Sequence, residues 1–229
     1  MEKEESLPFE LYGFYRSSCS GRLRLALNLK GVKYAYKSVD TKNGQQRTSM
    51  YKKLNPAGTV PVLIDHRPGF DGASFPITQS VAALEYLEET LPVSFPLLPP
   101  ASQPLQRAKV RTLVEIVCDF QPVANRRVAK AVAELGYSFE SWMKEQSARG
   151  LRSFEGTVSE TAGKYSVGDV LSLADVCLIP SIWNAKQWGV DLSEFPTIMR
   201  IFNEASKHSE VQKAHWSVQP DTPADLAFD

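Results

Sequence analysis

The chain has 229 residues, of which 43% are hydrophobic and 23% charged, a composition typical of a globular protein with one or two domains. Its 26 basic and 26 acidic residues cancel, so no overall field would draw it to nucleic acid or to an anionic membrane. No apolar run approaches the roughly 20 residues of a membrane span, and the acidic N-terminus lacks the layout of a signal peptide. We therefore expect a cytoplasmic protein with neither nucleic acid nor membrane as a partner.

The three cysteines, Cys19, Cys118 and Cys177, lie far apart in the sequence. None belongs to a CxxC pair or to a His-linked spacing, so we expect neither a disulfide framework nor a metal site. Cys118 and Cys177 lie in apolar helical patterns, where a cysteine behaves as a small core residue. An odd number of cysteines without such spacing favours a reducing compartment.

The first half of the chain alternates between strand-like and helix-like segments. An apolar, aromatic run over residues 9–15 predicts a strand, and a helical pattern follows it as far as Lys30, with Gly31 as its C-cap. Residues 32–39 alternate apolar and polar side chains with period two, which predicts a second strand. The polar segment 44–53 is expected to be helical or irregular.

Two further strands and a helix complete this half. A turn over residues 54–59 leads into a strand that contains Pro61. Because proline cannot donate to a sheet ladder, Pro61 must lie at the start or edge of the strand, with a cis bond as one option. Residues 66–74 predict an exposed loop, residues 75–77 a short strand and residues 81–89 a helix. This order indicates an α/β domain.

A proline-rich connector separates the two halves, because residues 91–104 contain five prolines and cannot be helical. Beyond it only helical patterns remain. The first runs from Val110 to Cys118, and Pro122 should kink or end that helix. Further helical candidates are residues 134–148, 151–162, 173–186 and 197–206.

Ser172 and Asp175 have the spacing of a capping box in front of the apolar run 176–182. That helix is expected to form the buried centre of the second domain. The predicted fold class is α/β plus all-α. The predicted domains are an α/β domain over residues 8–91, a linker over 92–104 and an all-helical domain over 105–229.

A cluster of hydroxyl and thiol side chains, Ser17 to Ser20, lies where the first strand should turn into the first helix. Serine is a preferred N-cap, so these residues could simply cap the helix. A helix N-terminus also stabilises an anion. We predict that this anion is the thiolate of a bound cofactor.

The energies of such a site are sufficient. A free thiol has a pKa of about 8.5, and lowering it by two units requires about 2.7 kcal/mol. A hydrogen bond from a hydroxyl to an anion supplies about 1.5–3 kcal/mol, and a helix N-terminus about 0.3–2 kcal/mol. Neither a metal nor a histidine base is needed.

The whole pattern resembles that of a cytosolic glutathione transferase. The Val-Pro-Val-Leu sequence at 60–63, the Gln-Ser pair at 79–80 and the capping box are similar to motifs of that family. The Ser-Ser-Cys-Ser cluster, followed by Arg22-x-Arg24-x-Ala26-Leu27, resembles the zeta class. Further segments similar to zeta members are Gly44-Gln45-Gln46, Gln121-Pro122, Val123, Asn125, Gly168-Asp169 and Gln219-Pro220-Asp221-Thr222-Pro223. The resemblance extends from about Glu10 to Leu226.

The resemblance implies a thioredoxin-like N-terminal domain that binds glutathione, an all-helical C-terminal domain and a homodimer. Ser17 would hydrogen-bond the glutathione sulfur, and Ser18 and Cys19 would line it, which makes these three the catalytic candidates. The implied glutathione-binding residues are Ser17, Ser18, Cys19, Ser20, Gly21, Arg22, Gln46, Val60, Pro61, Gln79, Ser80 and Gln121. The implied substrate-binding residues are Asn125, Arg126, Arg127 and Gln187.

The activity implied by the zeta class is the cis-trans isomerisation of maleylacetoacetate to fumarylacetoacetate in phenylalanine and tyrosine catabolism. The thiolate would add to the double bond, the resulting single bond would rotate, and the thiolate would leave. Because the substrate carries carboxylates, its pocket needs cations or other donors.

Three alternatives remain open. Gly21 stands where zeta members commonly carry a bulkier residue, and Gln187 where an arginine is expected; both favour a transferase acting on α-halo acids or other small electrophiles. A glutathione-transferase-like module that dimerises without catalysis is another option. Cys19 could also act as a nucleophile in a redox role.

Overall fold

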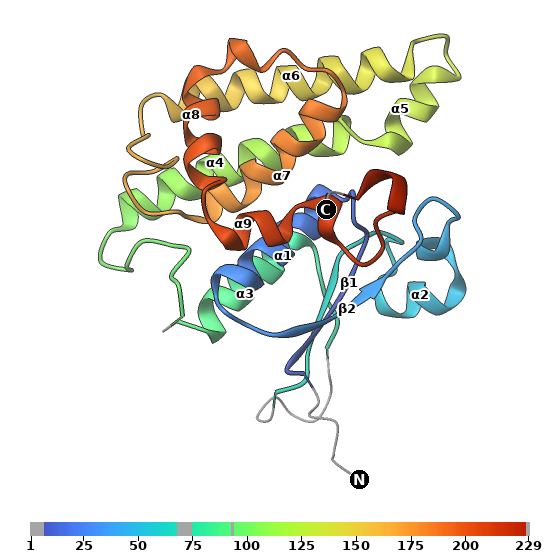
Figure 1. The fold of residues 1–229 in the computed structure, drawn as a ribbon, viewed down its shortest axis with the longest axis horizontal. Helices are drawn as coiled ribbons and strands as arrows, with labels where there is room; N and C mark the ends of the chain where they lie inside the picture. Colours follow the sequence, from blue (N-terminus) through green and yellow to red (C-terminus); the bar gives the residue numbers. More distant parts are fainter. Residues whose placement is uncertain (1–6, 68–74, 93, 228–229) are drawn as a thin grey trace. The chain divides into compact units, whose positions relative to one another are not determined.

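The computed structural model describes residues 7–67, 75–92 and 94–227 (Figure 1). The chain divides by its contacts into two compact units, the first comprising Met1–Phe95 with Glu210–Asp229, and the second Pro96–Ser209. The C-terminal segment thus groups with the first unit, whereas the sequence pattern places it in the helical domain. Two side chains of the first helix account for this grouping: Arg24 Nε donates to the carbonyl of Ala214 at 3.1 Å, and Asn28 Nδ2 to that of Glu210 at 3.2 Å.

The first unit is built on a four-stranded mixed sheet. The strand order is β2-β1-β3-β4, with β1 parallel to β2 and antiparallel to β3, and β3 antiparallel to β4. Leu11, at the centre, pairs with Tyr36 on one side and Leu63 on the other. The strands are β1 (Phe9–Gly13), β2 (Tyr34–Ser38), β3 (Val62–Asp65) and β4 (Ile77–Thr78).

Helix α1 is buried nearly all round, because β1 and α3 both contact it and the C-terminal segment hydrogen-bonds to it. The predicted order of strands and helices in this unit is confirmed. The bond between Val60 and Pro61 is cis. Of the predicted loop 66–74, residues 68–74 lie outside the described part of the chain. The helices of this unit are α1 (Ser18–Leu29), α2 (Ser49–Leu54), preceded by a 3-10 turn (Gln45–Arg47), and α3 (Ser80–Thr90); α9 (Ser209–Ala214) starts at the unit boundary.

The second unit is mostly helical, as predicted. Pro104 occupies the first turn of α4, and Pro122 the last, so the expected end of that helix after Pro122 is confirmed. Helix α5 was not among the predicted helices. The five main helices are α4 (Pro104–Val123), α5 (Arg126–Ala133), α6 (Phe139–Val158), α7 (Leu173–Gln187) and α8 (Pro196–Ala205).

The predicted helices 134–148 and 151–162 are wrong as separate elements, because α6 runs through Gly150 without a break. The glycine serves packing instead: a Cβ at this position would lie 2.0 Å from Cγ of Phe120 on α4. Gly150 therefore lets the two helices approach closely, and an isolated glycine inside a helix is tolerated at a cost of about 1 kcal/mol.

The capping box at the start of α7 is confirmed. Asp175 is fully buried and accepts hydrogen bonds from the backbone N–H groups of Ser166 and Ser172, at 2.9 and 2.8 Å, and from the Ser172 hydroxyl at 3.0 Å. Burial raises the pKa of this carboxyl, and these hydrogen bonds oppose the rise. Helix α7 is buried along almost its whole length, as expected for the centre of the unit.

Candidate functional site

The serine cluster lies at the turn that joins β1 to α1. The backbone N–H of Ser17 donates to the carbonyl of Phe14 at 3.0 Å, which closes the turn, and Ser17 is the N-cap of α1. Its Oγ accepts a hydrogen bond from the backbone N–H of Ser20 at 3.2 Å. The predicted cap is thus confirmed, and the Ser17 hydroxyl is held at the positive end of the helix dipole.

The other members of the cluster differ in their surroundings. Ser20 is fully buried, and its Oγ accepts from the backbone N–H of Phe14 at 3.3 Å, which gives it a role in holding the turn. Ser18 is 7% exposed, whereas Cys19 is partly exposed and forms no disulfide. Ser17 and Cys19 are therefore the more accessible members, and an anion at this helix end would meet them first.

Arg16 is a candidate that the sequence reasoning missed. Its guanidinium lies 5.3 Å from the centroid of the Trp216 ring, and its buried Nε has no hydrogen-bond partner among the described residues. Its position directly before Ser17 in the sequence could have identified this cation as a candidate site residue. Such a cation favours anionic groups at the same helix end.

Two predicted residues, Gln79 and Ser80, lie at the start of α3. Ser80 begins the helix, and its buried Oγ accepts a hydrogen bond of 3.0 Å from Nη1 of Arg22 on α1. Gln79 has φ +68°, in the left-handed region that non-glycine residues rarely adopt. Backbone strain of this kind is concentrated at ligand-binding sites. Arg22 itself is 1% exposed, so it positions Ser80 and has little surface with which to contact a ligand.

Gln46 carries an unsatisfied acceptor. Its Nε2 donates to the carbonyl of Thr41 at 3.3 Å, while its buried Oε1 has no partner among the described residues. The backbone oxygen of Gln46 lies 3.1 Å from where a Cβ would stand on Gly58, so Gln46 is next to the segment that leads to Val60 and Pro61. A buried oxygen without a partner is costly, and an N–H of a bound ligand would remove that cost.

The remaining predicted site residues belong to the second unit. Asn125 is the N-cap of α5, and its Oδ1 accepts from the backbone N–H of Arg127 at 2.8 Å. The Arg126 guanidinium lies 5.9 Å from the ring centroid of Trp188, the residue after Gln187. The start of α5 and the end of α7 are therefore neighbours. Gln121 lies in the last turn of α4 and is partly exposed, whereas Asn125, Arg126, Arg127 and Gln187 are exposed.

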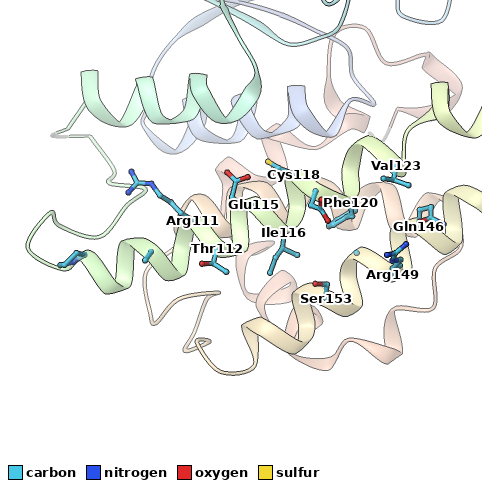
Figure 2. A pocket seen from close by; sticks show the side chains of 14 residues that line it. Arg111, Thr112, Glu115, Ile116, Cys118, Phe120, Val123, Gln146, Arg149 and Ser153 are labelled. Carbon is cyan, nitrogen blue, oxygen red and sulfur yellow. The ribbon is translucent and has the colours of Figure 1, made fainter.

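A groove of about 1250 Å³ lies along α4 and α6 (Figure 2). Its lining includes Ile116 and Phe120 together with charged residues of both signs, among them Arg111, Glu115 and Arg149. None of the predicted site residues lines it. The groove lies within the second unit and shares no residue with the predicted glutathione site.

Two further properties bear on the expected chemistry. Among the residues the structure describes, no group of three or more His, Cys, Asp or Glu side chains is placed to hold a metal ion. No described helix is both long and apolar enough to cross a membrane.

Comparisons with known proteins match this architecture. The family model of the glutathione S-transferase N-terminal domain matches residues 16–90. A probable glutathione S-transferase of Coccidioides immitis is 48% identical over 95% of this chain and 97% of that protein. Maleylacetoacetate isomerase maiA of Aspergillus fumigatus is 47% identical over 99% of this chain and 98% of that protein.

Solved structures agree with these relatives. The maleylacetoacetate isomerase of Anaeromyxobacter dehalogenans, with glutathione bound in its active site, is 38% identical with a TM-score of 0.84, covering 95% of this chain and 99% of that one. A bacterial maleyl pyruvate isomerase, described as a zeta-class glutathione S-transferase, is 33% identical with a TM-score of 0.83, covering 93% and 100%. The chain therefore belongs to the glutathione S-transferase family. Within that family it is a member of the zeta class, the group of the maleylacetoacetate isomerases.

Proposed function

We propose that this protein catalyses the glutathione-dependent isomerisation of maleylacetoacetate to fumarylacetoacetate, a step of phenylalanine and tyrosine catabolism. Relatives with the name maleylacetoacetate isomerase match it over nearly their full length, which favours this activity over the dehalogenase and non-catalytic alternatives. The observation that carries the proposal is the position of Ser17, whose hydroxyl caps α1 next to the partly exposed Cys19.

The residues of the first unit fit glutathione. The unpartnered Gln46 Oε1 suits an amide N–H of the tripeptide. The N-terminus of α3, with Ser80 held by Arg22, suits a carboxylate. The backbone of Val60, presented by the cis bond to Pro61, suits pairing with an extended peptide. These groups suit an amide N–H, one carboxylate and the extended backbone of a bound peptide.

When bound, glutathione supplies a thiolate that adds to the activated double bond, permits rotation about the resulting single bond and leaves again. The chain's part is to keep that sulfur ionised. The Ser17 hydroxyl donates to it while the helix dipole of α1 and the Arg16 cation favour its negative charge. In the second unit, Asn125, Arg126 and Arg127 offer donors for the substrate's carboxylates, and Gln187 offers a neutral amide.

The experiment is a comparison of Ser17→Ala with wild type, using maleylacetone as the substrate. Loss of a hydroxyl bond to an anion, about 1.5–3 kcal/mol, should lower kcat at neutral pH by about 10- to 100-fold. The control is Ser138→Ala, which removes an equivalent N-cap at the start of α6, where Ser138 Oγ accepts from the Ser141 N–H. Unchanged turnover in Ser17→Ala would refute the proposed role of this hydroxyl.

We further propose that the protein acts as a homodimer in the cytosol, where reduced glutathione is available. The groove between α4 and α6 suits contact with a second copy. An interface with two-fold symmetry must be self-complementary, and the groove carries Arg111 and Arg149 as well as Glu115 and Asp119, beside apolar side chains.

Charge reversal tests this contact. Arg149→Glu should shift the protein towards monomer in sedimentation experiments, because a two-fold contact doubles the number of reversed charges. Arg152→Glu is the matched control: Arg152 lies on the same helix but outside the groove, in an exposed ion pair with Glu194. Equal behaviour of the two variants would contradict the proposed interface.

The assignment of glutathione binding and substrate binding to different domains stays a prediction. We propose that residues 8–91 bind glutathione, residues 92–104 connect, and residues 105–229 hold the substrate, with one addition. The C-terminal segment from Glu210 groups with the glutathione-binding unit.

A further inference from the structure

The C-terminal segment reaches the turn in front of Ser17 through one carboxylate. Asp221 Oδ2 accepts a hydrogen bond of 2.9 Å from the backbone N–H of Tyr15, a residue 206 positions earlier in the chain. The same oxygen accepts a second bond of 3.3 Å from the Tyr36 hydroxyl. Asp221 thus joins the end of the chain to the turn between β1 and α1.

The turn depends on side chains from other segments for its remaining hydrogen bonds. The carbonyl groups of Phe14 and Tyr15 accept from Arg24, from Nη1 at 3.4 Å and from Nη2 at 3.0 Å respectively. The N–H of Phe14 donates to Ser20 Oγ. The Tyr15 N–H donates to Asp221. Each polar backbone group of these two residues is therefore fixed, and Asp221 is the partner that comes from the far end of the chain.

The carboxylate is held at a cost. Asp221 Oδ1 is buried and has no hydrogen-bond partner among the described residues. An unsatisfied buried carboxylate oxygen lowers stability, so an aspartate used only to attach the tail would be a poor choice. A carboxylate does, however, hold a backbone N–H more firmly than a neutral acceptor does.

We propose that Asp221 is a positioning residue for catalysis: by fixing the Tyr15 N–H it sets the orientation of the turn and therefore of the Ser17 hydroxyl. Ser17 closes this turn through its N–H bond to the Phe14 carbonyl, so a rotation of the Tyr15 peptide moves Ser17 directly. Misplacement of a catalytic hydroxyl by about 1 Å can cost up to about 100-fold in rate. The inference rests on the proposed role of Ser17 in ionising glutathione.

The test compares Asp221→Ala and Asp221→Asn with wild type. In Asp221→Ala we expect kcat for maleylacetone to fall about tenfold at neutral pH, equivalent to about 1.4 kcal/mol. The pKa of the bound glutathione thiol, followed by the ultraviolet absorbance of its thiolate, should rise, and kcat should recover at higher pH. Asp221→Asn retains an oxygen acceptor for the Tyr15 N–H and should stay within about threefold of wild type.

A control variant and a second measurement distinguish a positioning role of Asp221 from a structural one. Asp225→Ala removes an exposed carboxylate from the same segment and should leave kcat and the thiol pKa unchanged. Hydrogen exchange of the Tyr15 amide without glutathione should quicken in Asp221→Ala only, a result that does not depend on the isomerase activity. If wild type itself lacks activity, the proposed function fails, whereas the exchange result still reports on the contact.

Two results would overturn the inference. One is an Asp221→Ala variant with wild-type kcat and an unshifted thiol pKa. The other is an equal loss of kcat at every pH in Asp221→Ala and Asp221→Asn with no shift of the thiol pKa, which would assign Asp221 to stability alone.

Discussion

Arg22 on α1 and Ser80 at the start of α3 are joined by a buried hydrogen bond of 3.0 Å between Nη1 and Oγ. This bond links the two helix N-termini on which the proposed glutathione site depends. In the proposed site, one would present Ser17 to the sulfur and the other would present Ser80 to a carboxylate of the peptide. The two helix ends are thus held in a fixed relation within one unit.

Arg22→Met should raise KM for glutathione about tenfold with a smaller effect on kcat. The reason is that Ser80 loses the donor that orients its hydroxyl, whereas the hydrogen bonds of Ser17 are unchanged. The measurement is steady-state kinetics with glutathione varied. Arg107→Met is the control, since Arg107 likewise donates one guanidinium hydrogen bond, to the carbonyl of Pro99, but in the second unit. A change in kcat alone would contradict the assignment.

Gln46→Leu should weaken glutathione binding while leaving the free protein as stable as wild type or more so. It removes a buried oxygen that has no partner among the described residues, and relief of that cost offsets the loss of the 3.3 Å bond from Gln46 Nε2 to the Thr41 carbonyl. We expect Kd for glutathione, measured by calorimetry, to rise by about tenfold, a loss of about 1.4 kcal/mol. Gln45→Ala, at the exposed neighbouring residue whose Oε1 accepts from the Asp40 N–H, should leave Kd unchanged. Reduced stability with unaltered Kd would identify Gln46 as a structural residue.

Asp175→Ala should destabilise the second unit severely, by about 3 kcal/mol or more in urea unfolding. It leaves two buried backbone N–H groups and one hydroxyl without their acceptor. Asp191→Ala removes an exposed N-cap from a short 3-10 helix and should cost only about 0.5–1 kcal/mol. Similar losses of unfolding free energy in both variants would show that burial does not increase the contribution of a capping aspartate.

Asp65 predicts a dependence of stability on pH. Burial alone would raise the pKa of this carboxyl, but hydrogen bonds from Arg67 and Tyr86 outweigh it and hold the pKa below its ordinary value. A depressed pKa stabilises the folded state above the unfolded pKa of about 3.9, and that stability is lost as the pH falls through the folded value. Asp65→Asn should therefore be about 1 kcal/mol less stable at pH 7. The difference should shrink in strong acid, and a constant difference at every pH would count against the ion pair.

Gly150→Ala should destabilise the protein by about 1–3 kcal/mol, because the new Cβ would stand 2.0 Å from Cγ of Phe120. Gly156→Ala, on the same helix, meets nothing within 4 Å and should instead stabilise it by about 0.5–1 kcal/mol. Thermal unfolding measures both. Adding Phe120→Ala should cost less in the Gly150→Ala background than in wild type, and strict additivity would exclude the clash.

Local patterns in the sequence were enough to predict much of this protein. Three features that were predicted depend only on residues within a few positions of one another. They are the cap at Ser17, the capping box of Ser172 and Asp175, and the proline at the start of β3. The helix break predicted near Gly150 failed for the opposite reason. Whether a glycine ends a helix or admits a neighbour depends on what packs against it, here Phe120.

The sequence by itself determined the order of the strands and helices in the first unit, the N-cap at Ser17 and the zeta-class pattern. Only the tertiary structure decided that Arg22 donates to Ser80, that Gln46 Oε1 has no partner among the described residues, and that Asp221 accepts from Tyr15, 206 positions earlier. The physical reason is that hydrogen bonds between distant segments require the sheet and its helices to be assembled first. No periodicity or spacing along the chain carries that information.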